Sequence, residues 1–120
     1  DDAVKSGRTV LTSPKLLSEG LLRDEGQGDG GLFKGILIRY FTELTEHPTI
    51  NSTDKEKFAA FLKFNAQTFY KKGILRPAML SGSNWKTAPA PGAITDLTTQ
   101  SSGVMLIEAA AKLDKDGYFN

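Results

Sequence analysis

The chain has 120 residues, of which 24% are charged and 39% hydrophobic, and its formal net charge is +1. These values are typical of a globular domain, and the balanced charge excludes the strongly basic surface on which nucleic-acid binding depends. With no cysteine and a single histidine, His47, the chain has no disulfide, no thiolate catalysis and no histidine-rich metal site. We therefore expect no metal and no cofactor. No apolar run approaches the roughly 20 residues that a membrane-spanning helix needs.

Apolar residues recur at helical spacing, and strand-like alternation is scarce. A first helix is predicted over 3–12, and it ends before Pro14 because the residue preceding a proline avoids the α region. A short second piece covers 15–22, followed by a polar, glycine-rich loop over 23–31. The next helix, 32–46, is apolar around most of its circumference, which indicates packing on more than one side.

A third helix is predicted over 53–72, with Thr53 and Glu56 as a capping box at its start and Gly73 as the residue through which the chain leaves it. Asn65 falls on its apolar face, so we expect its amide to be hydrogen-bonded to neighbouring backbone. A long irregular stretch, 74–93, separates this helix from the last one, 95–113, which Asp96 or Thr95 would cap. The prediction is an all-α chain of four to five helices.

The loop 26–31 matches the pattern G-x-G-x-x-G and opens a helix, but a dinucleotide site also needs a hydrophobic strand just before it, and 19–25 is not one. A flexible loop and a carbohydrate-binding loop remain, and we favour the second. Lys34 lies in the first turn of the following helix, where the helix dipole disfavours a cation. It is either a surface lysine with a buried stem or a charge in a polar cleft, paired with a carboxylate such as Asp29.

Trp85 lies in a loop between amide and hydroxyl side chains. An indole face beside such groups suits a sugar ring, whose C–H face stacks while its hydroxyls find hydrogen-bond partners. A loop tryptophan can equally close the top of a hydrophobic core, and the sequence leaves both roles open. Glycoside hydrolysis needs two carboxyl groups at a controlled separation, and no such pair stands out. The adjacent Asp1 and Asp2 are interpreted as a helix start.

The segment Phe33–Tyr40 reads F-K-G-I-L-I-R-Y and resembles a run found in glycoside hydrolase family 76, whose members are α-1,6-mannanase-like enzymes built on an (α/α)6 toroid. The resemblance extends, more weakly, over most of the chain. It implies that residues 1–120 are one all-α domain or fragment, the C-terminal part of such a toroid. It also implies an endo-acting, retaining hydrolysis of α-1,6-linked mannan by two adjacent aspartates that lie outside this chain.

The same resemblance implies that the loops at one end of the inner helices form the cleft, with Asp29, Phe33, Lys34 and Trp85 as candidate substrate-binding residues. The expected partners are α-mannan and the remainder of the toroid, and the expected location is secreted, periplasmic or at the cell surface. The chain alone would be inactive, and its uncovered helix faces would favour self-association. The main alternative is a non-catalytic helical module that binds carbohydrate or protein. Another toroidal sugar enzyme, such as an epimerase, is disfavoured because epimerases of that shape rely on histidines.

Overall fold

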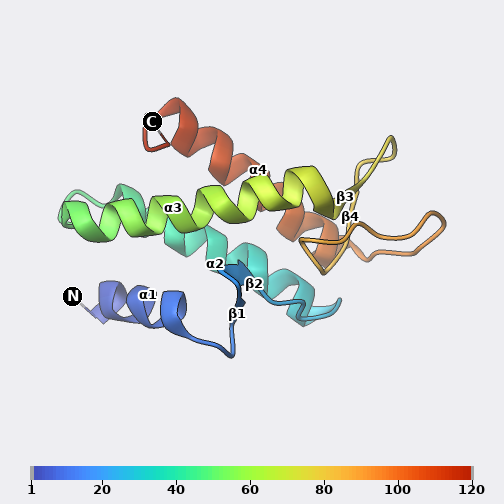
Figure 1. Ribbon diagram of the computed structural model, residues 1–120, viewed down its shortest axis with the longest axis horizontal. Helices are drawn as coiled ribbons and strands as arrows, with labels where there is room; N and C mark the ends of the chain where they lie inside the picture. The colour runs from blue at the N-terminus through green and yellow to red at the C-terminus, as the bar shows by residue number, and fades with distance from the viewer. Residues whose placement is uncertain (1, 120) are drawn as a thin grey trace.

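A computed structural model describes residues 2–119 and is predominantly helical. The predicted all-α class is confirmed, and the elements are shown in Figure 1. The main helices are α1 (Asp2–Thr12), α2 (Asp29–Glu46), α3 (Ser52–Thr68) and α4 (Leu97–Lys115), and α3 continues into a π-helical turn, η1 (Phe69–Gly73). Two antiparallel hairpins of two-residue strands complete the fold: β1 (Leu17–Ser18) with β2 (Leu21–Leu22), and β3 (Ile74–Leu75) with β4 (Leu80–Ser81).

Helices α2 and α4 form the most extensive contact between elements. Small residues let them approach closely: a Cβ added to Gly35 would come within 2.9 Å of the Ser102 Cα. The Ser102 hydroxyl accepts a hydrogen bond from the Gly35 N–H at 3.0 Å and donates one to the Gly31 carbonyl. The small residues of α2 and α4 therefore set the short distance between these two helices.

The hydrophobic core lies where α2, α3 and α4 meet. The Phe41 ring of α2 packs edge-on against Phe58 of α3, with the ring centroids 5.3 Å apart. Burial of such side chains supplies the main driving force for folding. The side chains that are less than 2% exposed include both core aliphatics and aromatics: Ile38, Phe58, Leu62, Phe69, Trp85, Leu106 and Leu113. No helix within residues 2–119 is long and apolar enough to cross a membrane.

Helix α3 begins earlier than its sequence predicted. Asn51 is the N-cap, and its side-chain oxygen accepts a hydrogen bond from the Asp54 N–H at 2.9 Å. The capping box of Thr53 and Glu56 was therefore the wrong choice of helix start. Asn51 is favoured as the cap because its side-chain amide also donates a hydrogen bond to the Asp54 carboxylate at 2.8 Å. That carboxylate in turn receives two hydrogen bonds from the Arg8 guanidinium.

The Arg8–Asp54 ion pair fastens α1 to the start of α3. The Asp54 side chain is only 3% exposed. Hydrogen bonding from the Arg8 guanidinium is the main cause that lowers the pKa of Asp54. A two-point arginine–carboxylate contact has a defined geometry. The contact therefore fixes the position of α1 relative to the start of α3, in addition to pairing the two charges.

The segment predicted as a short second piece over 15–22 forms the β1–β2 hairpin, which Asn65 of α3 holds in place. The Asn65 side chain is fully buried. Its oxygen accepts a hydrogen bond from the Leu22 N–H at 3.0 Å, and its amide donates to the carbonyls of Gly20 and Phe61 at 3.1 and 2.9 Å. The expectation that this amide bonds to neighbouring backbone is confirmed.

Candidate functional site

Two loops meet at the N-terminal ends of α2 and α4. One, 23–28, is the acidic, glycine-rich loop before α2, and the other, 82–96, is the long loop before α4. The Asp96 carboxylate caps α4 by accepting from the Thr99 N–H at 2.9 Å, and it also accepts from the Gly28 N–H. Hydrogen bonds from Thr99 are the main cause that lowers the pKa of Asp96. Of the two predicted caps of α4, Asp96 and Thr95, the structure has Asp96, and the same carboxylate joins the two loops.

Gln27 adds a second link between these loops. Its side-chain amide donates to the Ile94 carbonyl at 3.2 Å, and its side-chain oxygen accepts from the Asp96 N–H. Through the Gln27 side chain, the glycine-rich loop is thus bound to backbone groups that lie 67 and 69 residues further along the chain. The strand before it, β2, has only two residues and pairs antiparallel with β1, which is not the βαβ unit that a dinucleotide site needs.

Lys34 is buried beneath this corner, with an exposed fraction of 1%. Its ammonium donates a hydrogen bond to the Ser83 carbonyl at 2.7 Å and lies 4.1 Å from the centroid of the Trp85 ring. Burial lowers its pKa to about 8, against the opposing fields of Asp24 and Glu25. The surface alternative for Lys34 was therefore wrong, and the carboxylates that act on it are Asp24 and Glu25 rather than Asp29.

Trp85 is also 1% exposed, so its burial favours the packing alternative for this residue. Its ring packs against Phe69, with the centroids 5.8 Å apart. The backbone of Trp85 also lies close to Gly73, where a Cβ would meet the Trp85 carbonyl oxygen at 2.6 Å. The indole closes the core between η1 and α2, with the ammonium of Lys34 on its face.

Asp29 and Phe33 lie four residues apart on α2 and are both exposed. Residues at that spacing share one face of a helix, so a carboxylate and an aromatic ring stand side by side at the N-terminal end of α2. The structure thus divides the four predicted site residues into an exposed pair, Asp29 and Phe33, and a buried pair, Lys34 and Trp85, which touch each other.

Sequence reasoning missed Asp24 and Ser83, which connect the two loops around Lys34. Burial alone would raise the pKa of Asp24, but hydrogen bonds from Ser83 and the Gly26 N–H and the charge of Lys34 lower it overall. The Gly26 N–H bond measures 2.8 Å. An acidic residue two positions before a glycine is a signal for such a turn, but nothing in the sequence links it to Ser83.

The displaced carboxyl pKa values do not identify a general acid. A catalytic acid needs a pKa raised toward neutrality, whereas those of Asp24, Asp54 and Asp96 are all lowered. Each of these three carboxylates is engaged in hydrogen bonds within the fold. Among residues 2–119, no three acidic or histidine side chains gather to form a metal site.

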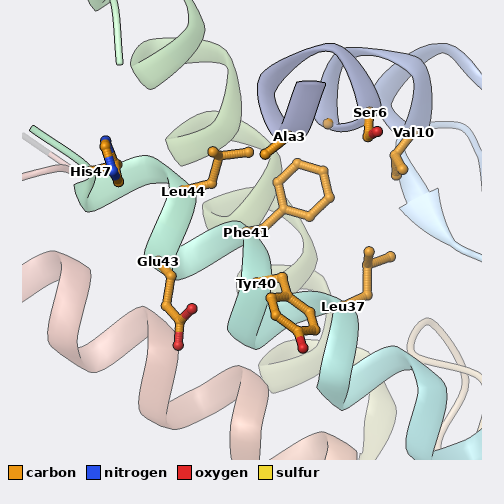
Figure 2. A pocket seen from close by; sticks show the side chains of 10 residues that line it. Ala3, Ser6, Val10, Leu37, Tyr40, Phe41, Glu43, Leu44 and His47 are labelled. Atoms are coloured by element: carbon orange, nitrogen blue, oxygen red, sulfur yellow. The ribbon is translucent and has the colours of Figure 1, made fainter. Parts of the chain in front are cut away.

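An apolar groove of about 370 Å³ runs between α1 and α2. Figure 2 shows the rings of Tyr40 and Phe41 and the side chains of Leu37 and Val10 along it, with Glu43 directed away from α1. A sugar site needs several convergent polar groups, whereas the surface of this groove is mostly apolar and its Glu43 is directed away from α1. The groove is suited to packing against apolar side chains.

Next to this groove, α2 exposes an apolar stripe: Phe33, Ile36 and Tyr40 are 44%, 40% and 65% exposed. Contiguous apolar surface of this kind is typical of an interaction face. We expect the chain to self-associate as its concentration rises, and the Ile36→Glu variant to remain monomeric, as measured by sedimentation velocity.

The matched control for this prediction is Ile94→Glu, because Ile94 is 88% exposed but lies in the loop before α4. It should associate like the unchanged chain. A sharp monomer peak for the unchanged chain at all concentrations would contradict an uncovered helix face.

Comparison with known proteins shows what this arrangement resembles. No protein-family model and no curated protein matches the chain. Among solved structures, the chain is similar to the α-1,6-mannanase GH76A of Salegentibacter sp. HEL1_6, with 49% sequence identity and a TM-score of 0.89. The match covers 94% of this chain and 32% of that one. An inactive variant of the same enzyme, in which two consecutive aspartates are replaced by asparagine, has equal similarity and is in complex with α-1,6-mannotriose.

A second similar structure is the Lin0763 protein from Listeria innocua, at 34% identity and a TM-score of 0.76, over 95% of this chain and 31% of that one. The chain therefore spans about one third of the length of the structures that it matches. A match to about one third of each mannanase is consistent with this chain being a C-terminal portion of such a protein. The mannanases are (α/α)6 toroid proteins. The resemblance of this chain to glycoside hydrolase family 76 is therefore confirmed over nearly its whole length.

Proposed function

We propose that this chain is part of a glycosidase that cleaves within α-1,6-linked mannan, and that it shapes the substrate cleft rather than supplying the catalytic carboxylates. The observation that carries this proposal is the 49% identity, over 94% of the chain, with a mannanase in complex with α-1,6-mannotriose. The match leaves only a few residues of this chain uncovered.

The proposed chemistry is a retaining hydrolysis by two adjacent aspartates, one the nucleophile and the other the acid/base. Support comes from the related mannanase, whose variant with two consecutive aspartates replaced is inactive. In this chain the consecutive pair is Asp1 and Asp2. Asp1 lies outside the described residues, and Asp2 is exposed in the first turn of α1, where a carboxylate favours helix formation. We assign the catalytic pair to the remainder of the protein.

Asp29 and Phe33 are the proposed contacts with substrate. The Phe33 ring offers an apolar face on which the C–H face of a mannose ring can stack, and the Asp29 carboxylate can accept hydrogen bonds from sugar hydroxyls. Both belong to the same end of α2 as the buried Lys34, which contacts Ser83 and Trp85 of the loop before α4. In this proposal the remainder of the toroid covers the groove between α1 and α2, and the enzyme acts outside the cell or in the periplasm.

A segment exchange tests the proposal. The chain replaces the matching third of the Salegentibacter mannanase, so that the host supplies its own aspartate pair. We expect the chimaera to hydrolyse α-1,6-mannan within about tenfold of the host in kcat/KM, since the exchanged backbone superimposes closely. In the chimaera, Phe33→Ala should raise KM about three- to tenfold with little change in kcat, because one stacking contact is lost.

Phe64→Ala is the matched control, because Phe64 of α3 is 46% exposed, close to the 44% of Phe33. Its KM should equal that of the chimaera. A folded chimaera with no activity on mannan would contradict the proposal. Sugar binding by the isolated chain, together with an inactive chimaera, would instead support the non-catalytic carbohydrate-binding module.

A further inference from the structure

Gly28, the residue before α2, is held on both of its polar backbone atoms by the start of α4. Its N–H donates to the Asp96 carboxylate at 2.5 Å, and its carbonyl accepts from the Thr98 hydroxyl at 2.7 Å. The preceding residue, Gln27, bonds to the Ile94 carbonyl and the Asp96 N–H. Because a glycine has no side chain with which to cap α2, these contacts set the position of the first turn of that helix.

Both oxygens of the Asp96 carboxylate are used inside the fold. One oxygen, Oδ1, accepts from the Thr99 N–H at 2.9 Å, and the other, Oδ2, accepts from the Gly28 N–H. Hydrogen bonds to an ionised acceptor are stronger than those between neutral groups. The bond to Gly28 is therefore the firmest contact that this glycine makes with the start of α4.

Asp29 follows Gly28 directly and is the first residue of α2. Its side chain is exposed, and among residues 2–119 no hydrogen bond or ion pair holds it. The carboxylate is thus available to a ligand, and its position depends on the backbone of the first turn. A binding group that is displaced by about 1 Å loses much of its effect on a bound substrate.

We propose that Asp96 is a positioning residue for sugar binding, which holds the N–H of Gly28 and thereby fixes the Asp29 carboxylate where the hydroxyls of mannan meet it. This inference rests on the proposed function, in which Asp29 contacts the substrate. Asp96 itself takes no part in cleaving the glycosidic bond. Its removal should therefore weaken substrate binding and leave the chemical step unchanged.

The test uses the Asp96→Asn variant of the chimaera. Asparagine caps helices as well as aspartate does, so its oxygen can still accept from the Thr99 N–H. Its amide nitrogen then faces the N–H of Gly28, and two donors cannot bond. We expect KM for α-1,6-mannan to rise about five- to tenfold, with kcat unchanged within about twofold. Thr98→Val, which releases the Gly28 carbonyl, should raise KM in the same direction.

A double variant shows whether Asp96 acts through Asp29. Asp29→Ala alone should raise KM by a similar factor, because the contact with the sugar is lost. Adding Asp96→Asn should then change KM no further, since residues that act on one contact are not additive. If the two factors multiply instead, or if Asp29→Ala leaves KM unchanged, the positioning role is wrong.

Asn51→Ala is the matched control, because Asn51 caps α3 and follows the C-terminal end of α2, away from Gly28. It should lower the Tm at least as much as Asp96→Asn does, yet leave KM unchanged. The proposal is overturned if Asp96→Asn keeps the KM of the chimaera, or if Asn51→Ala raises KM equally. A chimaera without activity would contradict the proposed function itself, and this inference would fail with it.

Discussion

Replacing Asn65 with leucine is expected to lower the free energy of unfolding by about 3 kcal/mol. Leucine has nearly the shape of asparagine, so the core keeps its volume while the hydrogen bonds are lost. The Leu22 N–H would lose its acceptor and the Gly20 carbonyl its donor, and Leu22 is buried. Each buried polar group left unsatisfied costs roughly 1–3 kcal/mol. Urea denaturation followed by circular dichroism measures the difference.

Gln67→Leu is the matched control, because Gln67 lies on the same helix and is exposed. Its effect should stay within about 0.5 kcal/mol, as is usual for surface positions. Equal stability of Asn65→Leu and the unchanged chain would mean that the β1–β2 hairpin does not depend on this amide. The role assigned to Asn65 would then be wrong.

Replacing Gly35 with alanine is expected to destabilise the chain by about 2 kcal/mol. In an unobstructed helix the same change stabilises by roughly 1 kcal/mol, because glycine is a poor helix former. Here the new Cβ would come within 2.9 Å of the Ser102 Cα and within 2.6 Å of the Met105 sulfur. The sulfur can move, but the backbone of α4 cannot move without separating the two helices, and overpacking of this kind costs typically 1–3 kcal/mol. Thermal unfolding should show the loss as a lower Tm.

Gly7→Ala in α1 is the comparison that isolates the backbone contact. Its Cβ would also meet a neighbour at 2.9 Å, but that atom is the Cζ at the tip of the Phe58 ring, and the next is a Leu44 methyl at 3.2 Å. Leu44 lines the groove and can shift, whereas Phe58 is fully buried. We therefore expect a loss of about 1 kcal/mol, smaller than at Gly35, because both neighbours are side chains rather than backbone. Equal losses for Gly7→Ala and Gly35→Ala would show that the α2–α4 crossing has no special intolerance of a side chain.

The long helices could be predicted from the sequence because their apolar period extends over several turns. The starts of α2 and α3 could not. Asp29 enters α2 three residues before the predicted start, and α3 begins at Ser52, after the cap Asn51. Two cap candidates only two positions apart, Asn51 and Thr53, give the same local signal. The choice between them is made by Arg8, 46 residues from Asp54 in sequence, which no local pattern contains.

The candidate site was predicted only in part, for a related reason. The corner at the N-terminal end of α2 could be located from its glycines and from the segment Phe33–Tyr40. The burial of Lys34 and Trp85 could not, because it results from the loop 82–96 packing against α2. In a sequence, a charged residue and an aromatic residue among polar neighbours are both predicted to lie at the protein surface. Only the tertiary contact, 4.1 Å from ammonium to ring, reverses that expectation.

The shared carboxylate of Asp96 has a consequence for how the two longest helices begin. It caps α4 through the Thr99 N–H and at the same time holds the N–H of Gly28, the residue from which α2 starts. Helix ends normally fray independently, each at the cost of its own terminal turn. Here the loss of one carboxylate would release both ends together. The first turns of α2 and α4, 68 residues apart in the chain, thus behave as one cooperative unit.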